Sequence, residues 1–352
     1  LALLRQLVNI AGVQQSDITI GDPTKIMPNY YYNMLYSEFP NVCYMANLGG
    51  LGRTQAQFDY DVPFYWSTPD AGGKVQDFIP VSFAGADYFI NFAILKSHND
   101  SGVTLCAKNH YGSLLRSPTG RLWGAQYNYY NLHNTRVTET PGDGYYRALV
   151  DLMGHPQLGG KTLLYLIDGL FAGKNWTSVP YKWNMEPFNG DWPSSLFVSQ
   201  DPVAIDSVCF DFLRTEWSAP LDYPRLLGTD DYLHEAAEAN NPPSGTFYDP
   251  NNDGVGLTSL GAHEHWNNST DKQYSRNLGT GNGIELVALR AAIPGDFDED
   301  GDVDLVDFSI LADQWMQAPG QPSADIAPEI PDGVVDILDL AVFVENWLAG
   351  VL

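Results

Sequence analysis

The C-terminal part of the chain contains one acidic stretch twice. Asp300-Gly-Asp-Val-Asp-Leu-Val-Asp307 and Asp332-Gly-Val-Val-Asp-Ile-Leu-Asp339 align residue by residue at an offset of 32. The segments that follow correspond at three apolar positions each: Phe308, Leu311 and Trp315, then Leu340, Phe343 and Trp347. This spacing is typical of a helix, so residues 294–352 are predicted to form a small all-α domain of two loop–helix units.

The first acidic loop has the spacing of an EF-hand calcium loop. Gly301 supplies the turn at the sixth position, and the twelfth holds Asp307 where glutamate is usual. Hard cations bind oxygen ligands, and Asp302 would contribute a backbone carbonyl. We therefore predict a calcium site with six ligand residues: Asp296, Asp298, Asp300, Asp302, Asp304 and Asp307.

The second loop departs from this spacing. Counting back from Asp332 places Pro328 and Ile330 where carboxylates are expected. An insertion would let Asp325 and Glu329 serve instead. The predicted metal ligands of this loop are Asp325, Asp332, Asp336 and Asp339.

The duplicated loop–helix resembles a type I dockerin, a module common on large secreted bacterial proteins. The resemblance implies Ca²⁺ as the bound cation and a cohesin-like protein domain as a partner. It also implies an extracellular or cell-surface protein that is held in a larger assembly.

Residues 1–290 alternate apolar runs of strand length with helical runs. This alternation is typical of α/β domains, so we predict a mostly parallel sheet flanked by helices, followed by a loop-rich part. The predicted strands lie near residues 17–21, 41–46, 87–95, 161–168 and 195–199.

Polar residues follow the apolar strand at 87–95. Lys96 and His98 stand at its carboxyl end, and a turn then leads to a helix start with Lys108 and Asn109. Open α/β sheets place their sites at this position. Two ammonium groups can neutralise an anion, and an imidazole titrates near neutral pH, where general acids and bases work.

Two further segments are predicted to supply carboxylates. Asp168 ends the apolar run 161–168, and Asp201 precedes Pro202 at the start of a helix, which indicates a helix cap. Asp206 lies one turn further on, and it either favours the helix dipole or points into the site. The loop 170–194 is expected to act as a lid, with Trp183 or Trp192 closing on a ligand.

Three groups of residues resemble one family. Lys96-Ser-His98, Gly102-Val-Thr-Leu105 and Lys108-Asn109 with Gly112 are similar to the core of the family called domain of unknown function 362. Its later motifs are matched by Leu166-Ile-Asp-Gly169 and by Asp201-Pro-Val-Ala-Ile-Asp206. The similarity spans about residues 1–215 and implies a fold and a site, but no reaction. Some members carry iron–sulfur ligands, but no such cluster is expected here because the three cysteines are widely spaced: Cys43, Cys106 and Cys209.

Composition excludes some partners. The net charge of −25, from 43 acidic and 18 basic residues, argues against nucleic acid, because phosphate neutralisation needs clustered Lys and Arg. No apolar run is long enough to span a bilayer. The chain opens at Leu1 without a methionine, and we interpret it as a cut or processed chain, in which a missing signal peptide is uninformative.

Two classes of function follow for the α/β domain. In the first it is an enzyme or a binder of a small anionic ligand, with the catalytic candidates Lys96, His98, Lys108 and Asp168. The ligand-binding candidates are Asn109, Asp201, Asp206, Trp183 and Trp192. In the second it is a non-catalytic module whose aromatic loops grip a polysaccharide. A purely structural role for the motifs is a third interpretation, because a Lys-Asn pair can cap strand ends.

His263 and His265 form a separate candidate. They lie two residues apart, so on a strand both would face one side and reach the same metal ion. No third ligand stands beside them in the sequence, and surface or core histidines are the alternative interpretation.

Overall fold

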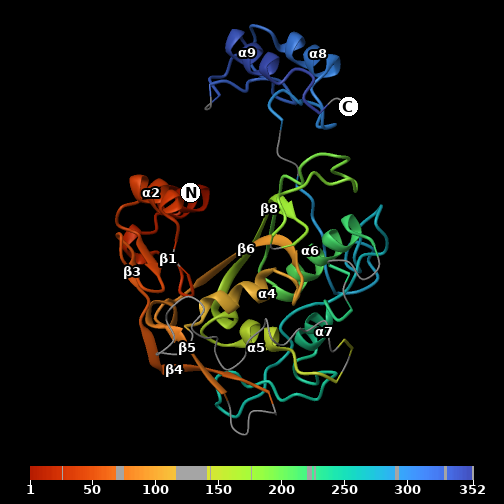
Figure 1. Ribbon diagram of the computed structural model, residues 1–352. Coiled ribbons are helices and arrows are strands. Elements are labelled where there is room, and N and C mark those ends of the chain that lie inside the picture. The colour runs from red at the N-terminus through yellow and green to blue at the C-terminus, as the bar shows by residue number, and fades with distance from the viewer. Residues whose placement is uncertain are drawn as a thin grey trace. The chain divides into compact units, whose positions relative to one another are not determined.

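The structure is a computed structural model, and it describes residues 1–25, 27–68, 75–115, 141–142, 144–175, 177–219, 224–225, 227–289, 293–328 and 331–350. Contacts divide the chain into two compact units, Leu1–Leu286 and Val287–Leu352, both drawn in Figure 1. None of the helices in these ranges has the length and apolar content that a membrane crossing requires. The first unit mixes strands and helices, as predicted for an α/β domain.

The first unit begins with a small parallel sheet of β1 (Thr19–Asp22), β2 (Cys43–Ala46) and β3 (Thr54–Gln55). Helix α1 (Ala2–Arg5) continues as a π-helical turn, and α2 (Asn29–Glu38) connects β1 to β2. Apolar side chains from these helices and strands form a core of their own: Leu4, Tyr32, Leu35, Phe39, Val42 and Tyr44.

An antiparallel pair follows, with β4 (Phe58–Trp66) and β5 (Val75–Pro80) leading into the short α3 (Val81–Ala84). The central sheet has four strands: β6 (Phe89–His98), β7 (Gly102–Val103), β8 (Thr162–Gly173) and β9 (Ser195–Ser199). Their order is β7-β6-β8-β9. Only β6 and β8 run parallel, while β7 and β9 are antiparallel to their neighbours.

The prediction of one mostly parallel sheet was therefore wrong in two respects. The strands near 17–21 and 41–46 belong to the separate N-terminal sheet, and the strand at 195–199 runs antiparallel to β8. The connection explains the direction of β9. The chain between β6 and β8 carries helices, as a parallel crossover requires, whereas β8 and β9 are joined by a loop that turns back.

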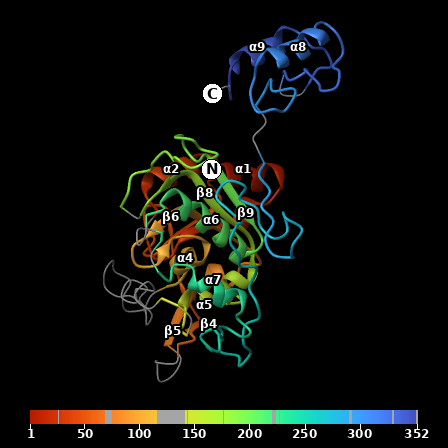
Figure 2. The same ribbon diagram turned by 90° about the vertical axis from the view of Figure 1, so that its right-hand side faces the viewer.

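Helices cover one face of the central sheet. Short α4 (Cys106–Asn109) and long α6 (Pro202–Glu216) pack against it, and Figure 1 shows them together there. Helices α5 (Ala148–Gly154) and α7 (Asp231–Ala237) pack next to them, while Figure 2 shows α6 beside β9. Between these layers lies the main core, which includes Leu95, Ile167 and Phe212.

The other face of the central sheet bears apolar side chains that are exposed. Strand pairing aligns Phe92 with Leu166 and Val198 in one row. Phe92 and Val198 are exposed and Leu166 is buried between them. The next row places Ile94 and Leu196, both exposed, on either side of Asp168. We call this surface the open sheet face.

The described residues of the second unit form two helices, α8 (Leu305–Gln314) and α9 (Ile337–Glu345). Each begins with a capping box, in which an aspartate accepts from the backbone of the first turn and a second aspartate, three residues later, accepts from the cap residue. The two helices share one small core: Phe297, Val303, Leu311, Ala324, Val335 and Phe343.

Candidate functional site

Lys96 and Asp168 lie on the open sheet face. Asp168 stands inside β8 rather than at its end, and it pairs with Ile94. Lys96 follows Ile94 by two residues on β6, so its side chain leaves the strand on the same face. Strand rise and spacing put the Lys96 and Asp168 Cα atoms roughly 8 Å apart. Sheet geometry thus brings these two predicted residues together.

The Lys96 ammonium is half-buried. Burial lowers the pKa of Lys96, and the charge of Lys25 lowers it further. Within the described part of the chain, no hydrogen bond or ion pair engages this ammonium. Lys161 is a useful contrast, because its ammonium donates to three carbonyls of residues 83–86 and to Gln157. Lys161 is a structural lysine, whereas the Lys96 ammonium has no such acceptors among the described residues.

The turn after β1 approaches this region. Asp22 ends β1, and its Oδ1 accepts from the backbone and hydroxyl of Thr24, which shapes the turn that carries Lys25. A Cβ on Gly112 would lie 3.8 Å from Asp22 Oδ1, so the glycine of the Lys-Asn motif packs against this turn. Lys25 was not predicted as a site residue, since no local signal in the sequence links it to Lys96, 71 residues later.

His98 organises the turn that follows β6. It is buried, and its Nδ1 accepts the backbone N–H groups of Asp100 at 3.0 Å and Ser101 at 3.4 Å. Since Nδ1 accepts, the ring proton is on Nε2, so Nδ1 is not available as a base. The Ser97 hydroxyl and the Asn99 side-chain oxygen are buried without a hydrogen-bond partner among the described residues. Such orphaned groups cost free energy, which marks this turn as unusual.

Asn109 and Lys108 lie at the end of α4. The Asn109 amide donates to Asn91 Oδ1 at 2.8 Å, and Asn91 donates to the Cys106 carbonyl at 2.9 Å. This chain of bonds fastens α4 to β6, so the predicted ligand-binding residue Asn109 has a structural role here. Lys108 is half-exposed and has interactions of its own.

Asp206 lies on the helix side of the sheet, away from Lys96. Its carboxylate accepts from the backbone N–H groups of Cys106 and Ala107, at 2.8 and 3.0 Å, and from the Tyr232 hydroxyl at 2.9 Å. Asp206 therefore caps α4 from a neighbouring helix, and its predicted role in ligand binding is corrected to this one. Complete burial raises the pKa of Asp206 to about 7, against the lowering effect of the three hydrogen bonds.

Asp201 is a helix cap, as its place before Pro202 indicated. Its Oδ1 accepts from Val203 and Ala204, and its Oδ2 accepts from Ala262 at 2.9 Å. Because β9 is antiparallel to β8, Asp201 follows β9 at the edge where β8 begins. The expectation that it shares an edge with Lys96 was wrong. Both aspartates of the Asp-Pro-Val-Ala-Ile-Asp motif thus hold helix starts.

The comparison with protein families agrees with these motifs. The sequence profile of the family described as "Domain of unknown function (DUF362)" matches residues 4–211, which is more than half of the chain. The chain belongs to this family. No curated protein matches it, and no solved structure does.

The last DUF362 motif ends at Asp206, before the loop-rich part of the first unit begins.

The loop between β8 and β9 is held in place by packing and hydrogen bonds, so it is not free to close. Trp183 is fully buried against Trp217, and the Glu216 carboxylate accepts from the backbone of Asn184 and Met185. The predicted role of Trp183 in closing on a ligand was therefore wrong. Trp192 is half-buried and packs edge-on against exposed Phe171, 5.2 Å between ring centroids.

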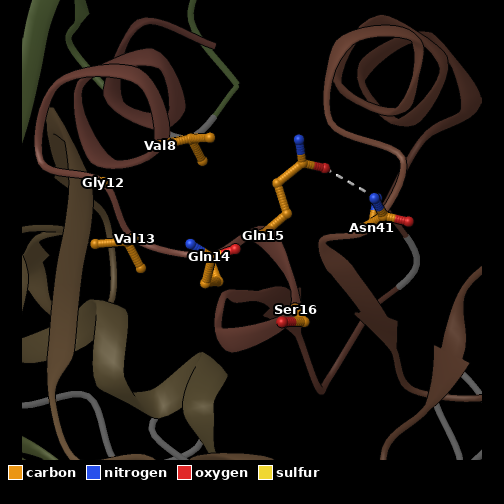
Figure 3. Close-up of a pocket in the computed structure, with 7 residues that line it drawn as sticks. All are labelled: Val8, Gly12, Val13, Gln14, Gln15, Ser16 and Asn41. Carbon is orange, nitrogen blue, oxygen red and sulfur yellow. Dashed lines mark hydrogen bonds between the residues drawn. The ribbon is translucent and has the colours of Figure 1, made fainter.

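An open hollow of about 560 Å³ lies elsewhere in the DUF362 domain, between the π-helical turn after α1 and the segment before β2 (Figure 3). Gln15 crosses it and accepts from the Asn41 backbone at 3.0 Å. Its lining has no charged side chain and no motif residue: Val8, Gly12, Val13, Gln14, Gln15, Ser16 and Asn41. The motif residues therefore lie apart from this hollow, and of these Lys96 and Asp168 lie on the open sheet face.

The first acidic loop of the second unit folds around Asp307. This fully buried carboxylate accepts from the backbone of Phe297, Asp298 and Asp304. Asp296 accepts from Gly301, which has the positive φ of +99° that the sixth loop position requires. Two groups of carboxylates each gather within 4.8 Å: Asp296, Asp298 and Asp307, then Asp302, Asp304 and Asp307.

The second loop repeats these bonds with different spacing. Asp339 accepts from the backbone of Ile326, Ala327 and Asp336, as Asp307 does in the first loop. Asp325 accepts from Gly333 at 2.8 Å and so takes the place of Asp296. The loop spans 325–339, three residues more than 296–307. This is the insertion that the sequence suggested, although Glu329 lies outside the described residues.

Proposed function

We propose that this protein is a secreted DUF362 protein whose first unit binds a small ligand through an anionic group. The observation that carries the proposal is the half-buried Lys96 ammonium, which has no partner in the described part of the chain. A desolvated ammonium without a counter-ion is costly, and an anion removes that cost. Lys25 lies near enough to lower the pKa of Lys96, and it would add a second positive charge.

The open sheet face suits the remainder of such a ligand. Exposed Phe92, Ile94 and Leu196 offer apolar contact, and Asp168 stands among them as an acceptor for hydroxyl groups. A charged sugar has both an apolar ring face and hydroxyl groups, so we propose a uronic acid or a similar anionic carbohydrate. The alternative is that the domain binds a longer polysaccharide without catalysis. The same exposed apolar face favours it. Binding is proposed rather than catalysis, since His98 Nδ1 is occupied by the turn.

Replacing Lys96 tests this proposal. Lys96→Met should weaken binding of glucuronate at least about tenfold, because a hydrogen bond to a charged group contributes about 1.5–3 kcal/mol. Isothermal titration with glucuronate, glucose and inorganic phosphate measures the effect. Lys272→Met is the matched control, since Lys272 lies beside Trp266 on the helix side of the sheet and should leave binding unchanged.

The pH dependence gives a second readout. The ammonium must be protonated to bind an anion, so affinity should fall as pH rises through the lowered pKa of Lys96. If wild type binds none of the three compounds, or if Lys96→Met binds as well as wild type, the anion site is refuted.

For the second unit we propose two calcium sites in a dockerin-like domain. The support is a buried carboxylate oxygen in each loop, Oδ1 of Asp296 and Oδ1 of Asp325, that has no hydrogen-bond partner among the described residues. Asp296 and Asp325 occupy equivalent places in the two loops, so the same carboxylate oxygen needs a partner in each loop. Desolvation and the charges of Asp300 and Asp304 raise the pKa of Asp302, which shows how closely like charges gather. A Ca²⁺ ion would satisfy these oxygens and offset their repulsion.

A cohesin-like domain is the proposed partner of the second unit. Both helices begin with an exposed apolar pair, Leu305–Val306 on α8 and Ile337–Leu338 on α9, each residue 49–71% exposed. The pairs stand 32 residues apart, at the same place in each repeat. Exposed apolar residues that recur at equivalent positions are typical of a contact surface rather than of a domain core. Anchoring of this kind would hold the DUF362 domain in an extracellular assembly.

A further inference from the structure

Three histidines and one aspartate converge beside α6. His234 comes from α7, His263 and His265 come from the loop after residue 260, and Asp230 precedes α7. The Nε2 atoms of His234 and His263 lie 3.3 Å apart, and His265 Nε2 lies 3.4 Å from Asp230 Oδ2. Ligand atoms of Asp230, His263 and His265 all lie within 4.8 Å of one another. Only His263 and His265 were predicted from the sequence as candidate ligands; Asp230, just before α7, and His234, within α7, complete the set.

Two of these distances, His234–His263 and His265–Asp230, match the edges of a metal tetrahedron. Zinc–nitrogen bonds of about 2.0–2.1 Å at tetrahedral angles separate neighbouring ligand atoms by roughly 3.3–3.4 Å. Both pairs have this spacing, and the rings of His263 and His265, 5.0 Å apart between centroids, join one pair to the other. Three imidazoles and a carboxylate are ligands for zinc and similar borderline cations, whereas calcium and magnesium favour sites made of oxygen.

Hydrogen bonds behind the cluster orient two of its rings. The Ser207 hydroxyl donates to the Val203 carbonyl at 2.7 Å, so its oxygen accepts from His263 Nδ1 at 2.9 Å. His265 Nδ1 donates to the fully buried Asp211 carboxylate at 2.8 Å. Each ring is therefore held with Nε2 turned to the centre of the cluster. Metal-binding histidines generally have such outer partners, which fix the tautomer and the ring orientation.

We propose that Asp230, His234, His263 and His265 bind one zinc-class divalent cation, oriented by Ser207 and Asp211. The ion would join α7 and the loop of residues 261–266 to α6. It would also support the motif turn, because Thr229 precedes Asp230 and packs against Gly102. A Cβ on Gly102 would lie 2.4 Å from Thr229, so these two segments meet closely. The four ligand residues lie outside the part matched by the DUF362 profile, whereas their outer partners Ser207 and Asp211 lie within it.

A hydrogen-bond network without metal is the competing interpretation. Burial lowers the pKa of His265, but its bonds to Asp211 and Asp230 outweigh burial and raise it to about 9. A protonated His265 would satisfy both carboxylates, and a neutral His234 ring could donate to His263. The two interpretations differ in what binds: a proton in one, a metal ion in the other.

Cobalt substitution of the full chain separates them. Protein stripped with a chelator should take up about one Co²⁺ or Zn²⁺ per chain at this site and develop the intense visible bands of tetrahedral Co²⁺. Octahedral Co²⁺ in the acidic loops would absorb weakly, and excess Ca²⁺ should leave the tetrahedral bands unchanged. Zinc should displace cobalt and abolish them.

Two variants complete the test. His234→Ala should lose the tetrahedral bands and weaken zinc binding at least 100-fold, with the fold intact because His234 is exposed. Asp211→Asn, which changes an outer partner, should weaken binding about 10–100-fold. Asn240→Ala, on the exposed segment after α7, is the control and should bind as wild type does. Absence of tetrahedral bands in wild type, or bands that persist in His234→Ala, would overturn the proposal.

Discussion

Removing calcium should selectively unfold the second unit. If the loops bind Ca²⁺ only when folded, free calcium at a thousand times its Kd stabilises this unit by about 4 kcal/mol per site, and a chelator removes that stabilisation. Calorimetry of the full chain should show one transition that shifts with calcium, by ten degrees or more, and one that does not. Among the described residues, the unit's core has six buried apolar residues, which is small, so the effect should be large.

Single substitutions assign the effect to each loop. Asp307→Ala should abolish the first site and leave the second, and Asp339→Ala should do the reverse, because each carboxylate closes only its own loop. Asp313→Ala removes an exposed aspartate of α8 outside both loops and serves as the control. A calcium-dependent transition that survives both loop substitutions together would refute the calcium sites.

Loss of the Asp206 carboxylate should give the second large effect. Asp206→Ala leaves two buried N–H groups and the Tyr232 hydroxyl without an acceptor, and it uncaps the helix that carries Lys108 and Asn109. Since each orphaned buried group costs about 1–3 kcal/mol, the free energy of unfolding of the first unit should fall by about 3–5 kcal/mol. Urea unfolding at pH 8 measures it.

Two further variants distinguish capping from other roles. Tyr232→Phe removes one of the three bonds and should cost only about 1 kcal/mol. Asp168→Ala is the matched aspartate substitution on the open sheet face. Among the described residues the Asp168 carboxylate accepts from Leu170 alone, so this substitution should cost less than Asp206→Ala. Equal losses for Asp168→Ala and Asp206→Ala would contradict the capping role.

The pH dependence of stability follows from the same residue. The folded pKa of Asp206, about 7, lies above its ordinary value of 3.8. The folded chain thus binds this proton more tightly than the unfolded chain. The stabilisation that this proton gives the folded chain is present below about pH 4 and is lost as pH rises to about 7. This slope should be absent in Asp206→Asn.

The sequence predicted the strands better than their arrangement. Apolar runs mark where strands form, and strands appear at each predicted segment. Strand direction is not local, however, and nothing in residues 195–199 indicates that this strand turns back against β8. Because of this reversal, Asp201 lies at the edge of the sheet opposite to the predicted one. Lys96 and Asp168 stayed on one face because β6 and β8 run parallel.

Side-chain roles were predictable where the partner is near in sequence. The cap formed by Asp201 and the acidic loop around Asp307 involve residues at most ten positions away, apart from the bond of Asp201 to Ala262. Asp206 caps a helix 100 residues away, so its helical position left its role open. His234 joins His263 across 29 residues, and Lys25 reaches Lys96 from a different sheet. Such partners become visible only when the chain is folded.

The distance along the chain between α4 and its cap has a consequence for synthesis. Cys106 and Asp206 are separated by 100 residues, so the helix start of the Lys-Asn motif leaves the ribosome well before its acceptor exists. A four-residue helix without a cap does not persist alone. The motif region should therefore stay protease-sensitive in nascent chains that stop before residue 206. It should become protected within the short interval in which α6 emerges, as a single late step of domain folding.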